Sequence, residues 1–397
     1  MPGVSERLAS LSPSATFAMA QKSNELKAQG VDVISLSVGE PDFNTPDHIK
    51  EAAKKAIEDN FSFYSPVVGF LELRKAIAEK LKNENGLTYT PAQIVCSNGA
   101  KQSLCNVLMA VVGKGDEVLI PAPFWVSYPE MVKIADGTPV IIYSDIESDF
   151  KITPEQLEAA ITPKTKVIML CSPSNPTGSV YTREELKGLA DVLAKYPEII
   201  ILSDEIYEHI NYLDKHVSIA EFPEVFERTV IVNGVSKGYA MTGWRLGWIA
   251  APKWIADACN TLQGQYTSTP CTIAQKAAEA AYTGDQQCVA DMRVAFERRK
   301  NLVVKMAREI PGLKVNEPKG AFYIFPDCSA YFGKSYNGTT VNNPEDLALF
   351  LLAEAHVACV GGTDFGAPNC IRMSYATSDE KLVEAFTRIK NALGKLK

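Results

Sequence analysis

The sequence predicts an α/β fold: a large domain with a mostly parallel, seven-stranded sheet sandwiched by helices, and a small α+β domain. Three observations predict it. The 397 residues exceed the size at which one hydrophobic core usually keeps growing. Short β-rich runs alternate with helical patterns, as in βα units. A long, charge-rich helical stretch over residues 286–310 then separates this alternation from later strand patterns.

Seven apolar runs rich in valine and isoleucine are the expected strands of the sheet. They cover residues 93–97, 117–121, 139–143, 166–171, 199–205, 228–236 and 246–251. The intervening segments carry helical periodicity. In residues 100–112, for example, Leu104, Leu108 and Val111 share one face at spacings of three and four residues.

The strand patterns at residues 321–327 and 371–376 indicate the smaller domain, with the helix over 286–310 as a bridge. Residues 33–43 form a further apolar run, and the pattern alone does not decide which domain it joins. We divide the chain into an N-terminal arm and part of the small domain (1–45), the large domain (46–285) and the small C-terminal domain (286–397).

Composition excludes several classes of protein. The 40 basic and 47 acidic residues give a net charge of -7, and the basic residues are scattered, so we expect no nucleic-acid partner. We expect no signal sequence, because the first residues lack a charged region followed by an apolar one, and no apolar stretch reaches the roughly 18 residues that span a membrane. The nine cysteines lack a C-x-x-C pair, which favours reduced, buried thiols over disulfides or a metal site. We expect a cytoplasmic protein without a metal.

Lys237 follows an expected strand, in the segment VSKGYAMTGWRLG over residues 235–247. A lone lysine is most often a solvated charge. A lysine just past the carboxyl edge of a parallel strand, however, lies where open α/β sheets bind ligands, and Ser236 and Arg245 could donate to an anion there. The pattern S-K-x-x-x-x-x-G-x-R-x-G resembles the cofactor-lysine signature of class I/II aminotransferases.

This resemblance implies the fold type I of pyridoxal 5′-phosphate (PLP) enzymes, with Lys237 joined to the cofactor as a Schiff base. The resemblance also assigns protein partners to the pyridine ring of PLP. Asp204, after a buried strand, would keep the pyridine nitrogen protonated, and Tyr207 would bond the ring hydroxyl oxygen. By itself, Asp204 could be only a helix N-cap.

Other motifs of the same family follow in order. S-P-x-N-P-T-G includes Asn175, which by resemblance also bonds the ring oxygen, although the segment could be only a proline-rich turn. Gly99 stands between a strand and a helix, where exposed N–H groups of Ala100 and Lys101 could face a phosphate. The resemblance places these three residues in the phosphate region with Ser236 and Arg245.

Trp125 resembles the family aromatic residue that stacks on the PLP ring, with Ile206 a plausible contact on the other ring face. In an apolar context a tryptophan is otherwise usually part of the core. Arg372, in IRMSYA, matches the family arginine that binds the α-carboxylate of the substrate, because a guanidinium pairs bidentately with a carboxylate. Gly39 would touch the same carboxylate through its backbone. These motifs span nearly the whole chain.

The resemblance extends to the bacterial-type aspartate aminotransferases, in which the lysine at position 101 would meet the distal carboxylate of aspartate or glutamate. It implies a ping-pong transfer between aspartate and 2-oxoglutarate, with Lys237 as anchor and then base. Prephenate, aromatic and alanine-like substrates stay open. So do a PLP-dependent C–S lyase and a non-catalytic PLP-binding regulator, although we expect no DNA-binding extension, which such a regulator would need.

Tyr64 precedes Gly69 and a helical pattern in YSPVVGFLELR. It could simply pack in its own loop. The matching tyrosine of the family crosses a two-fold interface to the cofactor phosphate of the neighbouring subunit. The resemblance therefore implies a homodimer with shared active sites.

Overall fold

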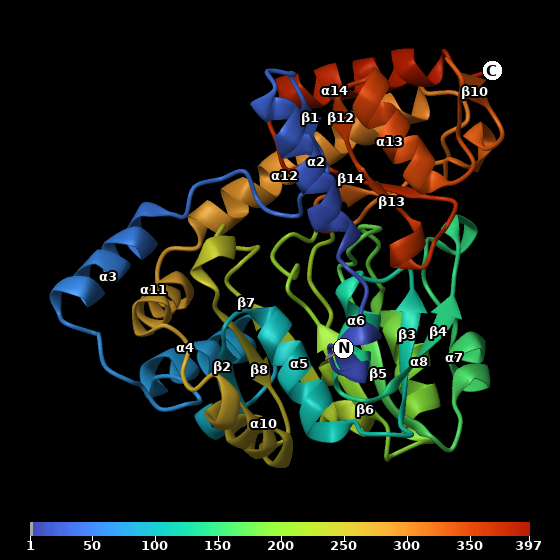
Figure 1. Ribbon diagram of the computed structural model, residues 1–397. Coiled ribbons are helices and arrows are strands. Elements are labelled where there is room, and N and C mark those ends of the chain that lie inside the picture. Colours follow the sequence, from blue (N-terminus) through green and yellow to red (C-terminus); the bar gives the residue numbers. More distant parts are fainter. Residues whose placement is uncertain (1–2) are drawn as a thin grey trace.

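A computed structural model describes residues 3–397, and its largest element is a seven-stranded sheet (Figure 1). The strand order is β2-β8-β7-β6-β5-β3-β4. Only β8 runs against its neighbours, β2 and β7. The strands are β2 (Ile94–Ser97), β3 (Glu117–Ala122), β4 (Thr138–Tyr143), β5 (Thr165–Cys171), β6 (Ile200–Asp204), β7 (Thr229–Gly234) and β8 (Gly247–Ala250). The prediction of a mostly parallel, seven-stranded sheet is therefore confirmed.

Helices cover both faces of this sheet because its central strands are apolar on both sides. Along β5, Val167 and Met169 pack in one core cluster with α5, α6 and α10, whereas Ile168 and Leu170 pack in another with α7 and α8. The helices of this part are α3 (Asp47–Glu58), α4 (Leu71–Lys80), α5 (Ala100–Val111), α6 (Ser127–Ile134), α7 (Pro154–Ala160), α8 (Arg183–Ala194), α9 (Pro223–Phe226), α10 (Lys253–Tyr266) and α11 (Thr272–Thr283).

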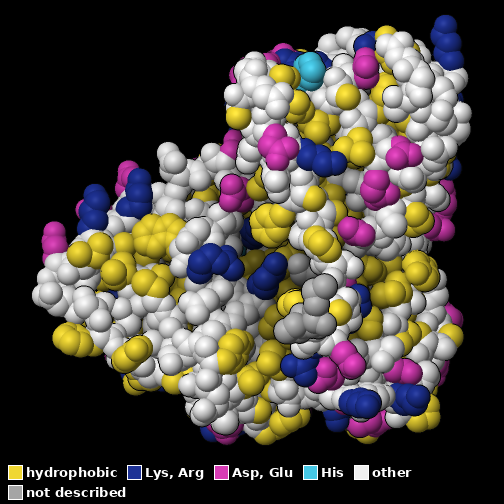
Figure 2. Space-filling model, viewed as in Figure 1, with side chains coloured by type: hydrophobic (Ala, Val, Ile, Leu, Met, Phe, Trp, Pro, Cys, Tyr) yellow, Lys and Arg dark blue, Asp and Glu magenta, His cyan; other side chains and the backbone are white. Residues whose placement is uncertain are grey.

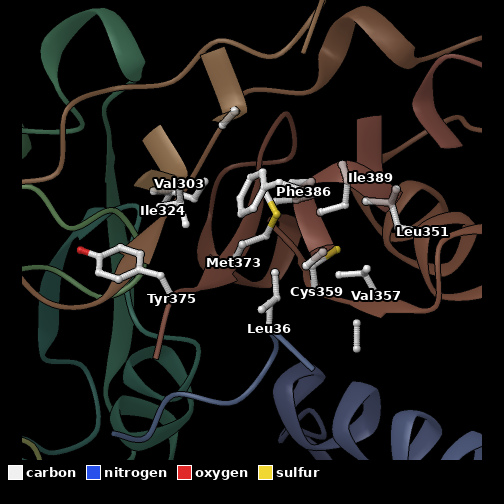
Figure 3. Close-up of a cluster of buried hydrophobic side chains, with 14 of the residues drawn as sticks. Leu36, Val303, Ile324, Leu351, Val357, Cys359, Met373, Tyr375, Phe386 and Ile389 are labelled. Atoms are coloured by element: carbon white, nitrogen blue, oxygen red, sulfur yellow. The ribbon is translucent and has the colours of Figure 1, made fainter. Parts of the chain in front are cut away.

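The C-terminal part forms a second core with the segment after the N-terminus. Leu36 is buried there in one cluster with Val303 and Phe386 (Figure 3). The elements are α1 (Glu6–Ala9), α2 (Ala15–Ala28), β1 (Ile34–Ser35), α12 (Gln287–Arg308), β9 (Tyr323–Ile324), β10 (Ser335–Tyr336), β11 (Thr339–Thr340), α13 (Pro344–Glu354), β12 (Val357–Ala358), β13 (Val360–Gly361), β14 (Ile371–Ser374) and α14 (Asp379–Leu393).

The structure decides where residues 33–43 belong. Strand β1 pairs in parallel with β12, so this segment joins the C-terminal part of the chain. The long helix α12 runs from the large sheet to the C-terminal part (Figure 1). These contacts favour boundaries near residues 45 and 285, which stay our proposal.

All nine cysteines are free thiols. The expectation that all are buried is wrong for Cys271, which is exposed, and incomplete for Cys105, Cys171 and Cys288, which are partly accessible. Cys271 lies at the start of α11, where the chain enters the helix from a surface loop. Over residues 3–397, no helix is both long enough and apolar enough to cross a membrane.

Candidate active site

One pocket lies between the carboxyl edge of the large sheet and the C-terminal part. Strands β2, β3, β5, β6 and β7 all end at this edge, and the antiparallel β8 begins there. Side chains that follow these strands therefore converge. From the sequence-predicted set, the pocket is lined by Gly39, Ala100, Lys101, Trp125, Asn175, Asp204, Ile206, Tyr207, Ser236, Lys237, Arg245 and Arg372.

Lys237 lies three residues beyond the end of β7, and its amine points into the pocket. Its Nζ donates a hydrogen bond to the backbone oxygen of Gly39 at 2.5 Å. Burial, with help from the nearby charges of Arg372 and Arg245, lowers the pKa of Lys237 to about 8. A substantial fraction of this amine is therefore neutral near pH 8, which is the form that attacks a carbonyl.

Asp204 ends β6 with a fully desolvated carboxylate. Tyr128, on α6, donates a hydrogen bond to its Oδ2 at 2.7 Å, and the N–H of Ile206 donates to Oδ1 at 3.2 Å. The bond from Ile206 is of the kind that an N-cap residue makes, which was the alternative role for Asp204. A turn and not a helix follows Asp204, however. Burial raises the pKa of Asp204 to about 6. A carboxylate in this state favours a cationic partner in the pocket.

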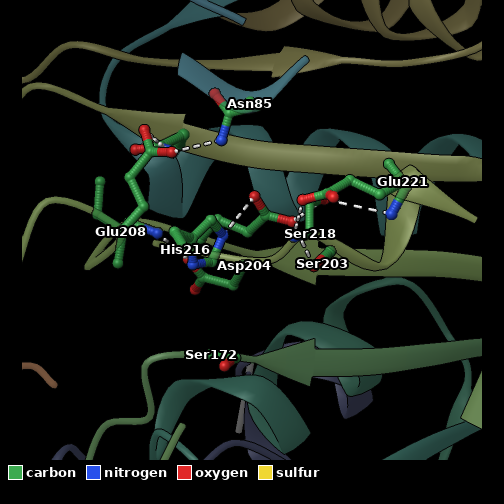
Figure 4. Close-up of polar contacts among 12 residues, drawn as sticks. Asn85, Ser172, Ser203, Asp204, Glu208, His216, Ser218 and Glu221 are labelled. Atoms are coloured by element: carbon green, nitrogen blue, oxygen red, sulfur yellow. Dashed lines mark hydrogen bonds and ion pairs between the residues drawn. The ribbon is translucent and has the colours of Figure 1, made fainter. Parts of the chain in front are cut away.

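The far side of the turn after Asp204 is held by a buried polar network (Figure 4). Glu205 accepts hydrogen bonds from the hydroxyls of Ser203 (2.9 Å) and Ser218 (2.6 Å) and from Nε2 of His216 (2.9 Å). The side chain of Glu205 thus points away from the pocket while that of Asp204 points into it. Alternate residues of an extended segment face opposite sides in this way.

Glu208 ties the same turn to a neighbouring strand. Its carboxylate accepts hydrogen bonds from Lys80, from Asn85 at 3.0 Å and from Asn233 at 2.7 Å. Burial alone would raise the pKa of Glu208, but the Lys80 ammonium holds it well below its usual range. Asn233 belongs to β7, which leads to Lys237, so the network fixes the segments that carry Asp204 and Lys237 relative to each other.

The start of α5 forms a cradle for an anion. Gly99 precedes the helix with φ of 86°, a conformation that favours glycine. A Cβ at this position would overlap the guanidinium of Arg245, so only glycine lets that side chain approach. The N–H groups of Ala100 and Lys101, the helix dipole and Arg245 all favour a phosphate here. Gly99 itself is not among the described residues that line the pocket.

Arg372 is only 1% exposed, which is unusual for a guanidinium. Its Nη1 donates to Oδ1 of Asn175 at 3.0 Å and its Nη2 to the backbone oxygen of Ser37 at 2.6 Å. Its Nε is buried and has no hydrogen-bond partner within the described chain. The rings of Tyr323 and Phe365 lie 4.8 and 4.9 Å from the guanidinium carbon. A guanidinium held in this way can bind a carboxylate.

Lys101 and Trp125 meet at the pocket wall. The Nζ of Lys101 lies 4.7 Å from the centre of a Trp125 ring. Within residues 3–397, Lys101 makes no ion pair with an acidic side chain. Its charge is therefore free to meet an anion that enters the pocket.

These groups fit PLP. An amine with a lowered pKa, a buried carboxylate with a raised one, an anion cradle and an aromatic wall surround one space. They match the aldehyde, the ring nitrogen, the phosphate and the ring face of that cofactor. The roles of the individual residues stay proposals.

Tyr64 lies elsewhere. Its side chain is 90% exposed in the loop between α3 and α4, and it is not among the described residues that line the pocket. Further residues that were not predicted from the sequence line the pocket. Among them are Tyr128 and Tyr323, which stand in apolar helical and strand patterns, and Phe17 and Glu40. Local sequence held no signal for these contacts, because their partners are distant along the chain.

Comparison with known proteins agrees with this geometry. Residues 31–389 match the family described as aminotransferase class I and II. The chain is 50% identical to the aspartate/prephenate aminotransferase of Cereibacter sphaeroides, over 98% of each chain. It superposes on the crystal structure of the aspartate aminotransferase from Rhizobium meliloti with a TM-score of 0.97, at 42% identity and full coverage of both chains. For the Thermus thermophilus aspartate aminotransferase with maleate, the TM-score is 0.93, at 42% identity and with 99% of this chain and 100% of that chain covered. The chain therefore belongs to the class I and II aminotransferase family.

Proposed function

We propose that this chain is a PLP-dependent aspartate aminotransferase, which transfers the amino group of aspartate to 2-oxoglutarate and gives oxaloacetate and glutamate. One observation carries the proposal: Lys237, Asp204 and Arg372 converge in a single pocket. The names of the relatives support it, since the Cereibacter and Rhizobium proteins are both described as acting on aspartate.

PLP, when bound, supplies an electron-withdrawing ring that stabilises negative charge at the substrate Cα. Lys237 would anchor the cofactor at rest, and its freed Nζ would then take the proton from the substrate Cα and deliver it to the C4′ carbon of the cofactor. Arg372 orients the α-carboxylate so that the Cα proton faces this amine. Because donor and acceptor use the same pocket in turn, we expect ping-pong kinetics.

Lys101 supports the choice of a dicarboxylic substrate. Among the described residues it has no acidic partner, and it lies at the pocket wall beside Trp125. The Thermus thermophilus relative was solved with maleate, which carries two carboxylates. We propose that Arg372 binds the α-carboxylate and Lys101 the distal one.

Lys101→Ala should therefore lower kcat/KM more for dicarboxylic substrates than for monocarboxylic ones. The lost charged hydrogen bond is worth about 1.5–3 kcal/mol, or about one to two decades in kcat/KM. The measurement is kcat/KM for aspartate and for alanine in both proteins. Equal losses for the two substrates would contradict the role of Lys101 while leaving the aminotransferase intact.

Prephenate is the second candidate acceptor, because the Cereibacter relative is named for both aspartate and prephenate. Initial rates over a panel of donors and keto acids, with prephenate, an aromatic keto acid and pyruvate beside 2-oxoglutarate, decide between them. Pyruvate released from cystathionine without a keto-acid acceptor would instead indicate a C–S lyase.

We further propose a homodimer with shared active sites, in the cytoplasm. Figure 2 shows hydrophobic side chains gathered over α3, α4 and α11. Among the exposed residues of this region are Ile57, Phe63 (82% exposed), Tyr64 and Leu71. Exposed apolar side chains that gather on one surface in this way favour an interface with another protein chain. The nine free cysteines support a reducing compartment.

Subunit mixing tests the shared site. Lys237→Ala and Tyr64→Ala proteins are combined, partly unfolded and reassembled, so that hybrid dimers form. If Tyr64 serves the partner subunit, one site of each hybrid keeps both Lys237 and Tyr64, and activity should rise above that of either parent. If Tyr64 serves its own subunit, every site lacks one residue and no rise occurs. Sedimentation as a monomer at working concentration would also contradict the proposal.

A further inference from the structure

Tyr323 stands where the cofactor and substrate sides of the pocket meet. It belongs to β9, in the small three-stranded sheet, and its side chain is 0% exposed. Its hydroxyl oxygen lies 2.8 Å from that of Tyr207, and either hydroxyl could be the donor of this bond. Burial raises the pKa of both tyrosines, so both hydroxyls keep their hydrogens.

The same side chain touches the two groups assigned to the substrate α-carboxylate. The Tyr323 ring supports the guanidinium of Arg372 at 4.8 Å. Its hydroxyl lies against Gly39, where a Cβ would overlap it. Removal of this hydroxyl would therefore affect Tyr207 directly, whereas removal of the ring would also affect Arg372.

The number of hydrogens at the two hydroxyls limits how they can be arranged. A phenol has one hydrogen to donate and accepts through its lone pairs. If Tyr207 donates to the ring oxygen of PLP, as the proposed function requires, it has no hydrogen left for Tyr323. The bond between the two hydroxyls must then be donated by Tyr323.

We propose that Tyr323 is a positioning residue, whose hydroxyl donates to Tyr207 and so reserves the hydrogen of Tyr207 for the cofactor ring oxygen. The bond also strengthens Tyr207 as a donor, because hydrogen bonds in a chain polarise one another. Tyr323 acts through Tyr207 and does not itself contact the reacting atoms in this account, which rests on the proposed function.

Tyr323→Phe tests this inference, because it removes the hydroxyl and keeps the ring beside Arg372. The readout is the pH titration of the absorption band of the lysine-bound cofactor. We expect the midpoint to rise by roughly half a unit to one unit, because Tyr207 becomes a weaker and less directed donor to the ring oxygen. KM for aspartate should change less than kcat, since Arg372 keeps its aromatic support.

Two further variants make the result specific. Tyr375→Phe removes a hydroxyl that is equally buried and also bonded to another tyrosine, Tyr212 at 3.1 Å, but lies outside the described pocket lining. It should leave the midpoint unchanged. In the Tyr207→Phe background, Tyr323→Phe should add no further shift, because its effect passes through Tyr207.

The outcomes separate this inference from the proposed function. A wild-type protein that forms no lysine-bound band with PLP would overturn the proposed function. A normal band whose midpoint is the same in wild type and Tyr323→Phe would overturn only the role of Tyr323. An equal shift in Tyr375→Phe, or an undiminished shift without Tyr207, would also overturn it.

Discussion

Replacing Lys237 by alanine is expected to lower the rate of transamination by roughly three orders of magnitude or more. The variant loses the covalent anchor of the cofactor and the base for the Cα proton together. The pKa of about 8 shows why this lysine suits both tasks, since it gives a neutral amine without extreme pH. No other amine of the described pocket lining stands at the end of β7 to replace it.

Two measurements check this result. Steady-state turnover with aspartate and 2-oxoglutarate gives the loss of rate, and the mass of the borohydride-reduced protein shows whether PLP is attached. Lys151→Ala is a suitable control, because Lys151 is partly buried in ion pairs with Asp149 and Glu185 outside the pocket lining. It should retain both activity and attachment. Turnover near the wild-type rate in Lys237→Ala would refute the assignment.

The sheet and the residues at its carboxyl edge could be predicted because both leave local signals. A buried parallel strand is a short apolar run, and a residue that follows such a run lies at the ligand-binding edge. Asn175, Trp125 and Lys237 follow predicted strands in this way, and Asp204 lies near the end of one. Topology then brings them together without any further information from the sequence.

The supporting side chains could not be predicted, since their roles depend on contacts between distant segments. Tyr128 and Asp204 are joined by a hydrogen bond across 76 positions, and Tyr207 and Tyr323 across 116. Tyr323 stands in the apolar strand pattern AFYIF, where an aromatic residue ordinarily belongs to the core. The strand that pairs with β1 could not be predicted either, because a two-residue strand carries too little pattern to specify its neighbour.

The role of Tyr64 could not be predicted from its local sequence for a different reason. Nothing in its local sequence or in its exposed position within one chain identifies a ligand, and only the family resemblance gives it a role. An exposed aromatic residue beside other exposed apolar side chains indicates a contact with a second molecule. Which atom it would meet there depends on the partner subunit, and the mixing experiment addresses that question directly.

Asp204→Ala is expected to lower kcat by about two to three orders of magnitude and to weaken the binding of PLP. The carboxylate is buried, and burial raises its pKa to about 6. A protonated ring nitrogen would stabilise the charged form of Asp204, and the charge would in turn keep that nitrogen protonated. Without the carboxylate, the ring withdraws electrons less strongly and removal of the Cα proton slows. PLP affinity by equilibrium titration and single-turnover rates with aspartate measure the two effects separately.

Asp204→Asn distinguishes this role from a purely structural one. The asparagine Oδ1 can still accept from the N–H of Ile206, and its Nδ2 can donate to the hydroxyl oxygen of Tyr128 in place of the bond that the carboxylate accepts, so the turn keeps a hydrogen bond to each partner. The amide carries no charge and cannot hold a proton on the ring nitrogen. If the charge is what matters, Asp204→Asn should be nearly as slow as Asp204→Ala while its thermal unfolding stays close to that of wild type. If Asp204 serves only to cap the turn, Asp204→Asn should bind PLP and turn over aspartate like wild type, and the assignment of Asp204 to the cofactor would then be wrong.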